Sequence, residues 1–244
     1  MEALLLAAGL GTRLRPLTND RPKALVEVNG KTMLEINIEN LVRHGVEHIV
    51  VNVHHFASQI VDFLASRRWP VHISISDETQ LLLDTGGAIA KAATLFRTPG
   101  PYLIHNVDVL SRIPLSCLPD YQSEIQSEAL LAVSRRATSR QLLFNAQGGL
   151  VGWHNRSTGE FLWGAEPCQQ YNEQAFSGIA LLGQSMLRFL SSRQGSFPVI
   201  PAYLEASKRY KISAFSHDSE DWMDVGKPEA LVPASDFLRQ THLP

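Results

Sequence analysis

Residues 3–17 of this 244-residue chain read Ala3-Leu4-Leu5-Leu6-Ala7-Ala8-Gly9-Leu10-Gly11-Thr12-Arg13-Leu14-Arg15-Pro16-Leu17. The continuous apolar run before Gly9 is typical of a strand that is buried on both faces of a parallel sheet. The glycines that follow let backbone N–H groups approach phosphate oxygens, where a Cβ would stand in the way. Arg13, Arg15 and then Lys23 add positive charge to the same loop, which suits a triphosphate. The stretch therefore predicts a strand followed by a phosphate-binding loop.

Two other glycine-rich nucleotide motifs do not fit the spacing of this loop. A dinucleotide fingerprint needs a third glycine where Leu14 stands, and it needs a helix where Pro16 blocks one. A Walker loop needs Gly-Lys-Ser/Thr after four intervening residues, and this sequence has none there.

Strands and helices alternate over the first 110 residues. Apolar runs predict strands at residues 3–8, 48–53, 71–76 and 102–104. Helical spacing predicts a helix after a capping box at Thr32 and Glu35, another around residues 56–64, and a third over 88–96. Further along, we expect a hairpin over 142–153, a strand over 176–182 and a last helix over 229–238. This rhythm predicts an α/β fold, with a Rossmann-like, mostly parallel but mixed sheet and helices on both faces.

The composition limits the partners and the location of the protein. A formal net charge of −2 leaves no global positive field, so we expect no binding to nucleic acid or to an anionic membrane. Cys117 and Cys168 lie far apart, which suggests neither a disulfide framework nor a zinc site. The apolar start of the chain is too short for a signal peptide or a membrane span, so we expect a cytoplasmic protein. The length favours a single domain over residues 1–244.

The loop resembles the nucleotide-binding signature of the sugar-1-phosphate nucleotidyltransferases. In that family the signature runs Leu-x-Ala-Gly-x-Gly-Thr-Arg-Leu-x-Pro-Leu-Thr and continues as Pro-Lys-x-Leu. It is matched here at Leu6, Ala8, Gly9, Gly11, Thr12, Arg13, Leu14, Pro16, Leu17, Thr18, Pro22, Lys23 and Leu25. The resemblance implies the nucleotidyltransferase fold, a nucleoside triphosphate and a sugar 1-phosphate as substrates, and nucleotide contacts along the loop from Ala8 to Lys23. It also implies that Arg13 and Lys23 neutralise the departing pyrophosphate.

Later motifs extend the resemblance over nearly the whole chain. The segment Asp84-Thr85-Gly86-Gly87 is similar to the family segment that packs against base and ribose. Physically, we expect two glycines at a helix start to offer free N–H donors. Asp108, within His105-Asn106-Val107-Asp108, and Asp224, within Trp222-Met223-Asp224-Val225-Gly226, match the two family aspartates that bind Mg²⁺ between the α-phosphate and the sugar phosphate. Two hard carboxylates suit this ion. Val107 departs from the pattern, which usually has glycine there.

Four further residues are weaker candidates for substrate contacts. Asn106 precedes the predicted metal ligand, and Glu78 precedes Asp84 by six residues. Gly178, within Phe176-Ser177-Gly178-Ile179, resembles the family strand where a glycine leaves space for the sugar ring. Asn52 ends a predicted strand and is a candidate for hydrogen bonding within the pocket.

Longer family members place a lysine against the sugar phosphate, but this chain has no lysine between Lys91 and Lys208. In this respect it resembles the compact branch typified by N-acetylmuramate-1-phosphate uridylyltransferase. The metal itself or an arginine is left to balance the sugar phosphate.

Three alternatives to that branch stay open at the level of sequence. Guanylyl transfer to mannose 1-phosphate or thymidylyl transfer to glucose 1-phosphate would use the same motifs. A non-catalytic sensor of the same fold is a second alternative, although such proteins typically lose the charged residues that this chain keeps. A sugar transferase with a metal-binding Asp-x-Asp is the third, because Asn106-Val107-Asp108 is a degraded form of that motif.

Overall fold

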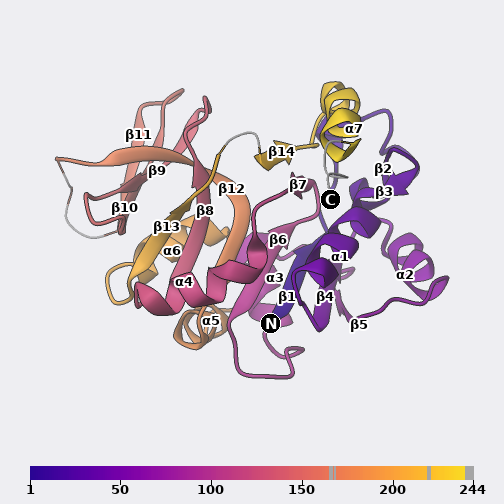
Figure 1. Cartoon of the computed structure of the whole chain (residues 1–244), viewed down its shortest axis with the longest axis horizontal. Helices are drawn as coiled ribbons and strands as arrows, with labels where there is room; N and C mark the ends of the chain where they lie inside the picture. Colours follow the sequence, from indigo (N-terminus) through magenta and orange to yellow (C-terminus); the bar gives the residue numbers. More distant parts are fainter. Residues whose placement is uncertain (165–166, 168, 219–220, 240–244) are drawn as a thin grey trace.

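Strand β1 (Glu2–Leu6) lies at the centre of the parallel part of the sheet. In the computed structural model, which describes residues 1–164, 167, 169–218 and 221–239, β1 pairs in parallel with β4 (His48–Val53) and β6 (Tyr102–Asn106). Strand β5 (His72–Asp77) extends the sheet in parallel beyond β4 (Figure 1). Because these four strands run the same way, the loops after them meet at one edge of the sheet.

The second half of the sheet is mostly antiparallel. The long strand β12 (Asn172–Leu182) pairs antiparallel with β6, with β8 and with β9, and β13 then pairs in parallel with β8. The other strands of this sheet are β8 (Ala129–Ser134), β9 (Arg140–Phe144), β10 (Leu150–Asn155), β11 (Glu160–Trp163) and β13 (Ile212–Ser216). Two short ladders stand apart from it: β7 (Val109–Ser111) with β14 (Trp222–Asp224), and β2 (Glu27–Val28) with β3 (Lys31–Thr32).

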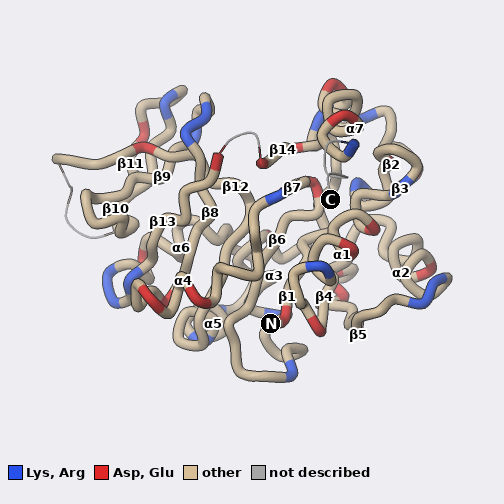
Figure 2. Tube along the Cα trace, in the orientation of Figure 1, with Lys and Arg blue, Asp and Glu red and all other residues tan. Residues whose placement is uncertain are grey.

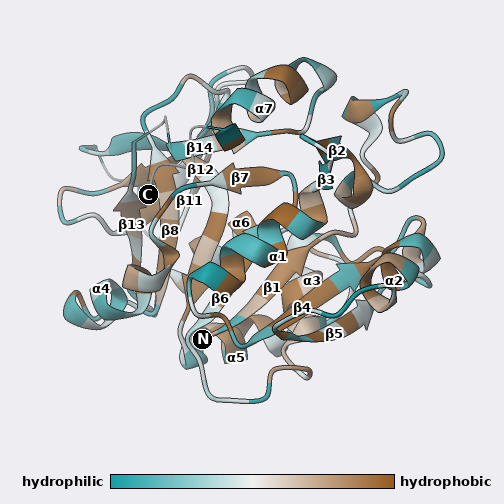
Figure 3. Cartoon of the chain, turned by 45° about the vertical axis from the view of Figure 1, so that its right-hand side comes forward, coloured by the Kyte–Doolittle hydropathy of each residue, from teal (hydrophilic) through white to brown (hydrophobic). Residues whose placement is uncertain are grey.

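Helices cover both faces of the sheet. One buried cluster joins Ala3 and Leu5 of β1 to α1, α2 and α4, and a second joins Leu4 to α3, α5 and α6. Successive residues of a strand point to opposite faces, so the apolar run of β1 supplies both cores. The helices are α1 (Met33–Arg43), α2 (Ala57–Ala65), α3 (Asp84–Ala92), α4 (Leu118–Glu124), α5 (Gln184–Ser191), α6 (Val199–Ala206) and α7 (Leu231–Arg239). Figure 3 shows β1 and β4 as largely hydrophobic along their length.

Most of the predicted elements are confirmed, including the α/β class with a mixed sheet. Helix α1 starts as expected, since the Glu35 backbone N–H donates to Thr32 Oγ1 over 3.1 Å. The hairpin is β9–β10 with its turn at Gly148. The helix predicted over 88–96 is misplaced, because α3 begins at Asp84 and ends at Ala92. Gly86 and Gly87 therefore lie inside the helix rather than before it.

Charged residues of both signs are distributed over the described trace, as Figure 2 shows. Of the helices in the described ranges, none is both long and apolar enough to cross a membrane.

Candidate active site

The glycine-rich loop leaves β1 at the edge where the parallel strands end. Gly11 has a φ of +65° and precedes the short 3-10 helix η1 (Thr12–Leu14). A side chain at Gly11 would be strained by this backbone and would also approach Thr18 Cγ2 and Lys23 Cβ to 3.1 Å. Thr18 Oγ1 donates to the Gly11 carbonyl over 2.8 Å. Gly11 thus folds the loop back on itself, so that Lys23, at the start of the 3-10 helix η2 (Lys23–Leu25), lies beside the end of β1.

Four charged side chains from three separate segments converge next to this loop. Lys23 Nζ lies 2.8 Å from Asp108 Oδ2, and both side chains are largely shielded, with 15% and 10% exposed. The guanidinium of Arg13 lies 4.0 Å from a carboxylate oxygen of Asp108 and 4.0 Å from one of Asp224. The two acidic residues are 116 positions apart in the sequence, yet they share one arginine.

The ladder between β7 and β14 brings Asp224 to this place. Asp224 is opposite Val109, and the Val225 N–H donates to the Asp108 carbonyl over 2.8 Å. The Gly226 N–H donates to Asp224 Oδ1 over 2.7 Å and orients the carboxylate. A Cβ on Gly226 would lie 2.7 Å from Arg13, so the glycine admits the guanidinium.

These two carboxylates fit the chemistry of a magnesium site. Mg²⁺ prefers hard oxygen ligands, and it is usually held by one or two protein carboxylates while water and substrate phosphates complete the shell. Within the described residues, no group of three or more His, Cys, Asp or Glu side chains is arranged to hold a metal. Asp108 and Asp224 are the residues that would hold such an ion, together with oxygens of the substrates.

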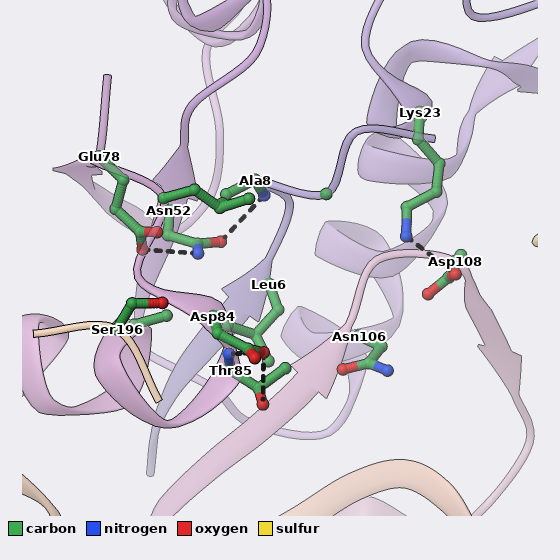
Figure 4. A pocket seen from close by; sticks show the side chains of 13 residues that line it. Leu6, Ala8, Lys23, Asn52, Glu78, Asp84, Thr85, Asn106, Asp108 and Ser196 are labelled. Carbon is green, nitrogen blue, oxygen red and sulfur yellow. Dashed lines mark hydrogen bonds and ion pairs between the residues drawn. The ribbon is translucent and has the colours of Figure 1, made fainter. Parts of the chain in front are cut away.

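A cavity of about 370 Å³ opens beside the charged cluster (Figure 4). Lys23 and Asp108 lie on one side of it, Asn52 and Glu78 on the other, and Asp84 and Thr85 between them. Its lining is Leu6, Ala8, Gly9, Lys23, Asn52, Glu78, Leu82, Asp84, Thr85, Ala88, Asn106, Asp108 and Ser196. The volume is within the range of small-molecule pockets.

A buried polar chain forms one wall of this cavity. Asn52 Oδ1 accepts from the Ala7 and Ala8 N–H groups over 2.6 and 3.3 Å, and Asn52 Nδ2 donates to Glu78 Oε1 over 2.8 Å. Glu78 is 1% exposed, and its other oxygen accepts from the Leu83 N–H over 3.1 Å. The loops after β1, β4 and β5 are thereby fixed to one another and to the start of α3.

The expectation of free N–H donors at Gly86 and Gly87 is wrong. Both N–H groups donate to the Phe197 carbonyl, over 2.9 and 3.3 Å. A Cβ on Gly86 would lie 2.3 Å from the Phe197 ring, and one on Gly87 would lie 2.5 Å from the Gly195 carbonyl. The glycines therefore admit the segment around residues 195–197 rather than a ligand. That segment carries Ser196 into the cavity lining, a residue that no local sequence pattern had indicated.

Gly178 also has a different physical role from the one expected. Its φ is +72°, it lies where the register between β8 and β12 shifts, and a Cβ there would come within 2.7 Å of Asn106 Nδ2. The space on the side where a Cβ would lie is filled by the Asn106 amide. Val107, which stands where the family usually has glycine, is fully buried in the core with α1 and α2.

The remaining predicted residues lie outside the cavity lining. Gly11, Thr12 and Arg13 lie in the loop after β1, at the start of η1. Asp224 lies close to Arg13. Gly86 and Gly178 pack against other parts of the protein. His105 precedes Asp108 by three residues and is completely buried. Burial lowers its pKa to about 4, although its contact with the Asn106 carbonyl acts in the opposite direction. It is therefore neutral at pH 7.

Comparisons with known proteins find relatives in both sequence and structure. The sequence profile described as "Nucleotidyl transferase" matches residues 2–141. The chain is 30% identical to N-acetylmuramate alpha-1-phosphate uridylyltransferase of Caulobacter vibrioides, over 98% of this chain and 97% of that protein. It is 29% identical to a mannose-1-phosphate guanyltransferase of Yarrowia lipolytica, of which it spans 64%. The inositol-1-phosphate CTP transferase from T. maritima shares the fold, with a TM-score of 0.77 and 18% identity over 98% of this chain and 95% of that one.

Proposed function

The chain belongs to the nucleotidyl transferase family, and from this premise we propose that it transfers a nucleotidyl group from a nucleoside triphosphate to a sugar 1-phosphate. The products are a nucleotide sugar and pyrophosphate. The observation that carries the proposal is the convergence of Arg13, Lys23, Asp108 and Asp224 beside one cavity, which Lys23 and Asp108 line. Two cations suit a polyphosphate, and two carboxylates suit the divalent ion that accompanies it.

The reaction is an in-line displacement at the α-phosphorus. An oxygen of the sugar phosphate forms the new P–O bond while the bond to the bridging oxygen of pyrophosphate breaks. A phosphate monoester is anionic near neutral pH, so the attacking oxygen needs no general base. This agrees with the state of His105, three residues before Asp108, which is buried and neutral.

The residues of the chain act by position and charge. Ala8 and Gly9 place the loop backbone along the triphosphate, with Asp84 and Thr85 on the nucleoside side of the cavity. Arg13 and Lys23 neutralise the charge that builds on the leaving pyrophosphate. Mg²⁺ held by Asp108 and Asp224 would stabilise the charge on the α-phosphate. The ion pair between Lys23 and Asp108 weakens when the triphosphate and Mg²⁺ bind.

We propose N-acetylmuramate 1-phosphate and a uridine triphosphate donor as the substrate pair. The support is that the Caulobacter vibrioides relative matches over nearly the full length of both chains. The mannose-1-phosphate guanyltransferase relative is similar in identity but extends well beyond this chain. Residues 1–244 would then act as one nucleotidyltransferase domain, in the cytoplasm, where nucleoside triphosphates are available.

A non-catalytic nucleotide-sugar sensor is the second candidate, and the retained charges argue against it. All four charged residues are present and are close to one another. A sensor would have no need for the ion pair between Lys23 and Asp108 beside the nucleotide cavity.

The decisive experiment is a matrix of four nucleoside triphosphates against several sugar 1-phosphates, scored by pyrophosphate release. We expect release with N-acetylmuramate 1-phosphate and UTP in the presence of Mg²⁺. Asp108→Asn and Asp224→Asn should each reduce turnover by at least about 10²-fold, while Asp62→Asn, an exposed control on α2, should not. No release from any pair would refute the catalytic proposal and favour the sensor.

A further inference from the structure

Arg136 lies just after β8, and both terminal nitrogens of its half-buried guanidinium donate to protein oxygens. NH1 donates to Ser134 Oγ over 3.0 Å, to Ser177 Oγ over 3.1 Å and to the Ala175 carbonyl over 3.3 Å. NH2 donates to the Phe176 carbonyl over 2.6 Å. Ser134 ends β8, and the other three acceptors belong to the irregular part of β12 around Gly178, where the register of the sheet shifts. Arg136 therefore ties the end of β8 to this part of β12.

The same guanidinium stacks on the first residue of β14. Arg136 Cζ lies 3.9 Å from the centre of the Trp222 ring, a distance typical of a cation–π contact. Trp222 Nε1 donates to the Ser177 carbonyl over 2.6 Å. The Trp222 side chain is thus held between the arginine and β12, two residues before Asp224.

Strand β14 is short, so few backbone hydrogen bonds hold it in the sheet. It has three residues and, among the described strands, pairs with the three-residue strand β7, and a two-stranded ladder is marginal in water without further packing. Asp224 itself is exposed, and its carboxylate contacts Arg13 at 4.0 Å and the Gly226 N–H. Besides the pairing with β7 and the packing of Met223 against the core, the contacts of Trp222 hold the strand that carries this carboxylate.

We propose that Arg136 is a positioning residue that holds β14, and with it the Asp224 carboxylate, in place for the divalent ion. This inference rests on the proposed function, which assigns Asp224 to that ion. The arginine also lies close enough to Asp224 to attract its charge. Because its terminal nitrogens already donate to β12 and β8, Arg136 acts through Trp222 rather than by gripping the sugar phosphate.

The chemistry of the contacts calls for arginine in particular. A planar guanidinium can lie flat on an indole while its edge donates to several oxygens, which a lysine ammonium cannot do. Ser177 extends the network, since its hydroxyl is also 2.8 Å from His217 Nε2. His217 Nδ1 contacts the Asp218 carbonyl, so a neutral ring with the proton on Nδ1 satisfies both contacts.

Mn²⁺ binding to the protein with a non-hydrolysable triphosphate, measured by electron paramagnetic resonance, tests the inference without turnover. We expect Arg136→Met to weaken Mn²⁺ binding about 10- to 100-fold, as loss of an outer-shell support typically does. The KM for the triphosphate should change much less. Arg136→Lys keeps the charge and should weaken Mn²⁺ binding as Arg136→Met does. It replaces Arg136→Met in the measurement if that variant does not fold. Arg135→Met, at the exposed neighbour, is the matched control and should bind Mn²⁺ normally.

Asp224→Asn separates failure of this inference from failure of the proposed function. If Asp224→Asn weakens Mn²⁺ binding but Arg136→Met and Arg136→Lys do not, the positioning role is refuted and the metal assignment stands. If Asp224→Asn binds Mn²⁺ normally, the metal assignment falls, and the inference falls with it. Trp222→Phe keeps an aromatic ring but loses the donor to the Ser177 carbonyl. A Mn²⁺ affinity between that of the wild type and that of Arg136→Met would therefore support the mechanism.

Discussion

Lys23 Nζ and Asp108 Oδ2 are 2.8 Å apart, and this ion pair joins the glycine-rich loop to the turn after β6. The two residues come from segments that are separated by the whole of α1, α2, α3 and five strands. In the protein without substrate each charge neutralises the other, which lowers the cost of keeping both partly shielded from water. The pair therefore keeps a cation and a carboxylate ready at the position where a triphosphate and its ion would lie.

Replacing Lys23 should reduce catalysis strongly. Lys23→Met removes a preorganised charge at the leaving group, so kcat/KM for the triphosphate should fall about 10²- to 10³-fold. It also leaves Asp108 poorly paired, which should lower the free energy of unfolding by about 1–3 kcal/mol. Lys31→Met, which loses only an exposed pair with Glu39, is the control and should be nearly neutral in both assays. Near-normal kcat/KM in Lys23→Met would contradict the assigned role.

Gly178 should tolerate alanine much less well than a glycine of the same backbone conformation. Gly178 and Gly148 have φ values of +72° and +73°, but only at Gly178 would a Cβ meet a neighbour, Asn106 Nδ2 at 2.7 Å. Gly148→Ala should cost about 1 kcal/mol from backbone strain alone. Gly178→Ala should lower the free energy of unfolding, measured in urea, by more than this. It should also lower turnover, because the added methyl group displaces Asn106, which is close to Asp108 in the chain. Equal costs for the two variants would show that the contact with Asn106 is unimportant.

Glu78→Gln tests the polar chain that forms the wall of the cavity. The carboxylate accepts from Asn52 Nδ2 and from the Leu83 N–H, whereas an amide offers only one accepting oxygen. One of the two donors would lose its partner, at a cost of about 1–3 kcal/mol in stability. The KM for the triphosphate should rise as well, since the loops after β1 and β5 are then less firmly joined. Glu47→Gln, an exposed control, should unfold at the wild-type urea concentration.

Glu2 should make the protein sensitive to acid. Burial alone would raise the pKa of Glu2, but donors from Thr98, Arg97 and His48 together hold it below its ordinary value of 4.5. A carboxyl with a lowered pKa in the folded state stabilises the protein above its unfolded pKa, and this stabilisation is lost as the pH falls through the folded value. The loss should therefore occur below about pH 4.5.

Unfolding of Glu2→Gln over a range of pH checks this. At pH 7 the variant should be less stable than the wild type, and the difference should shrink as the pH falls below about 4.5. Glu229→Gln, at an exposed position, should follow the wild type throughout. A difference that is constant between pH 7 and pH 3 would rule out the lowered pKa.

Local chemistry explains why much of the architecture could be predicted. The strand before Gly9, the cap at Thr32 and the turn at Gly148 each depend on residues within a few positions of one another, so composition and spacing suffice to find them. The same holds for the glycine-rich loop, whose glycines and cations lie within 15 residues of one another. The helix over 88–96 was misplaced because glycine normally disfavours a helix interior, and the packing of Phe197 against α3 outweighs that preference.

The sequence by itself determined the α/β class, the glycine-rich loop and the charged residues available to it, because these follow from hydrophobic periodicity and from short-range backbone geometry. Only the tertiary structure decided that Asp224 lies beside Asp108, that Gly86 and Gly178 make room for Phe197 and Asn106, and that Arg136 supports β14. Each of these relationships joins residues far apart in the chain. Such contacts are set by how the sheet and its helices pack, and a single sequence carries no distance information between segments.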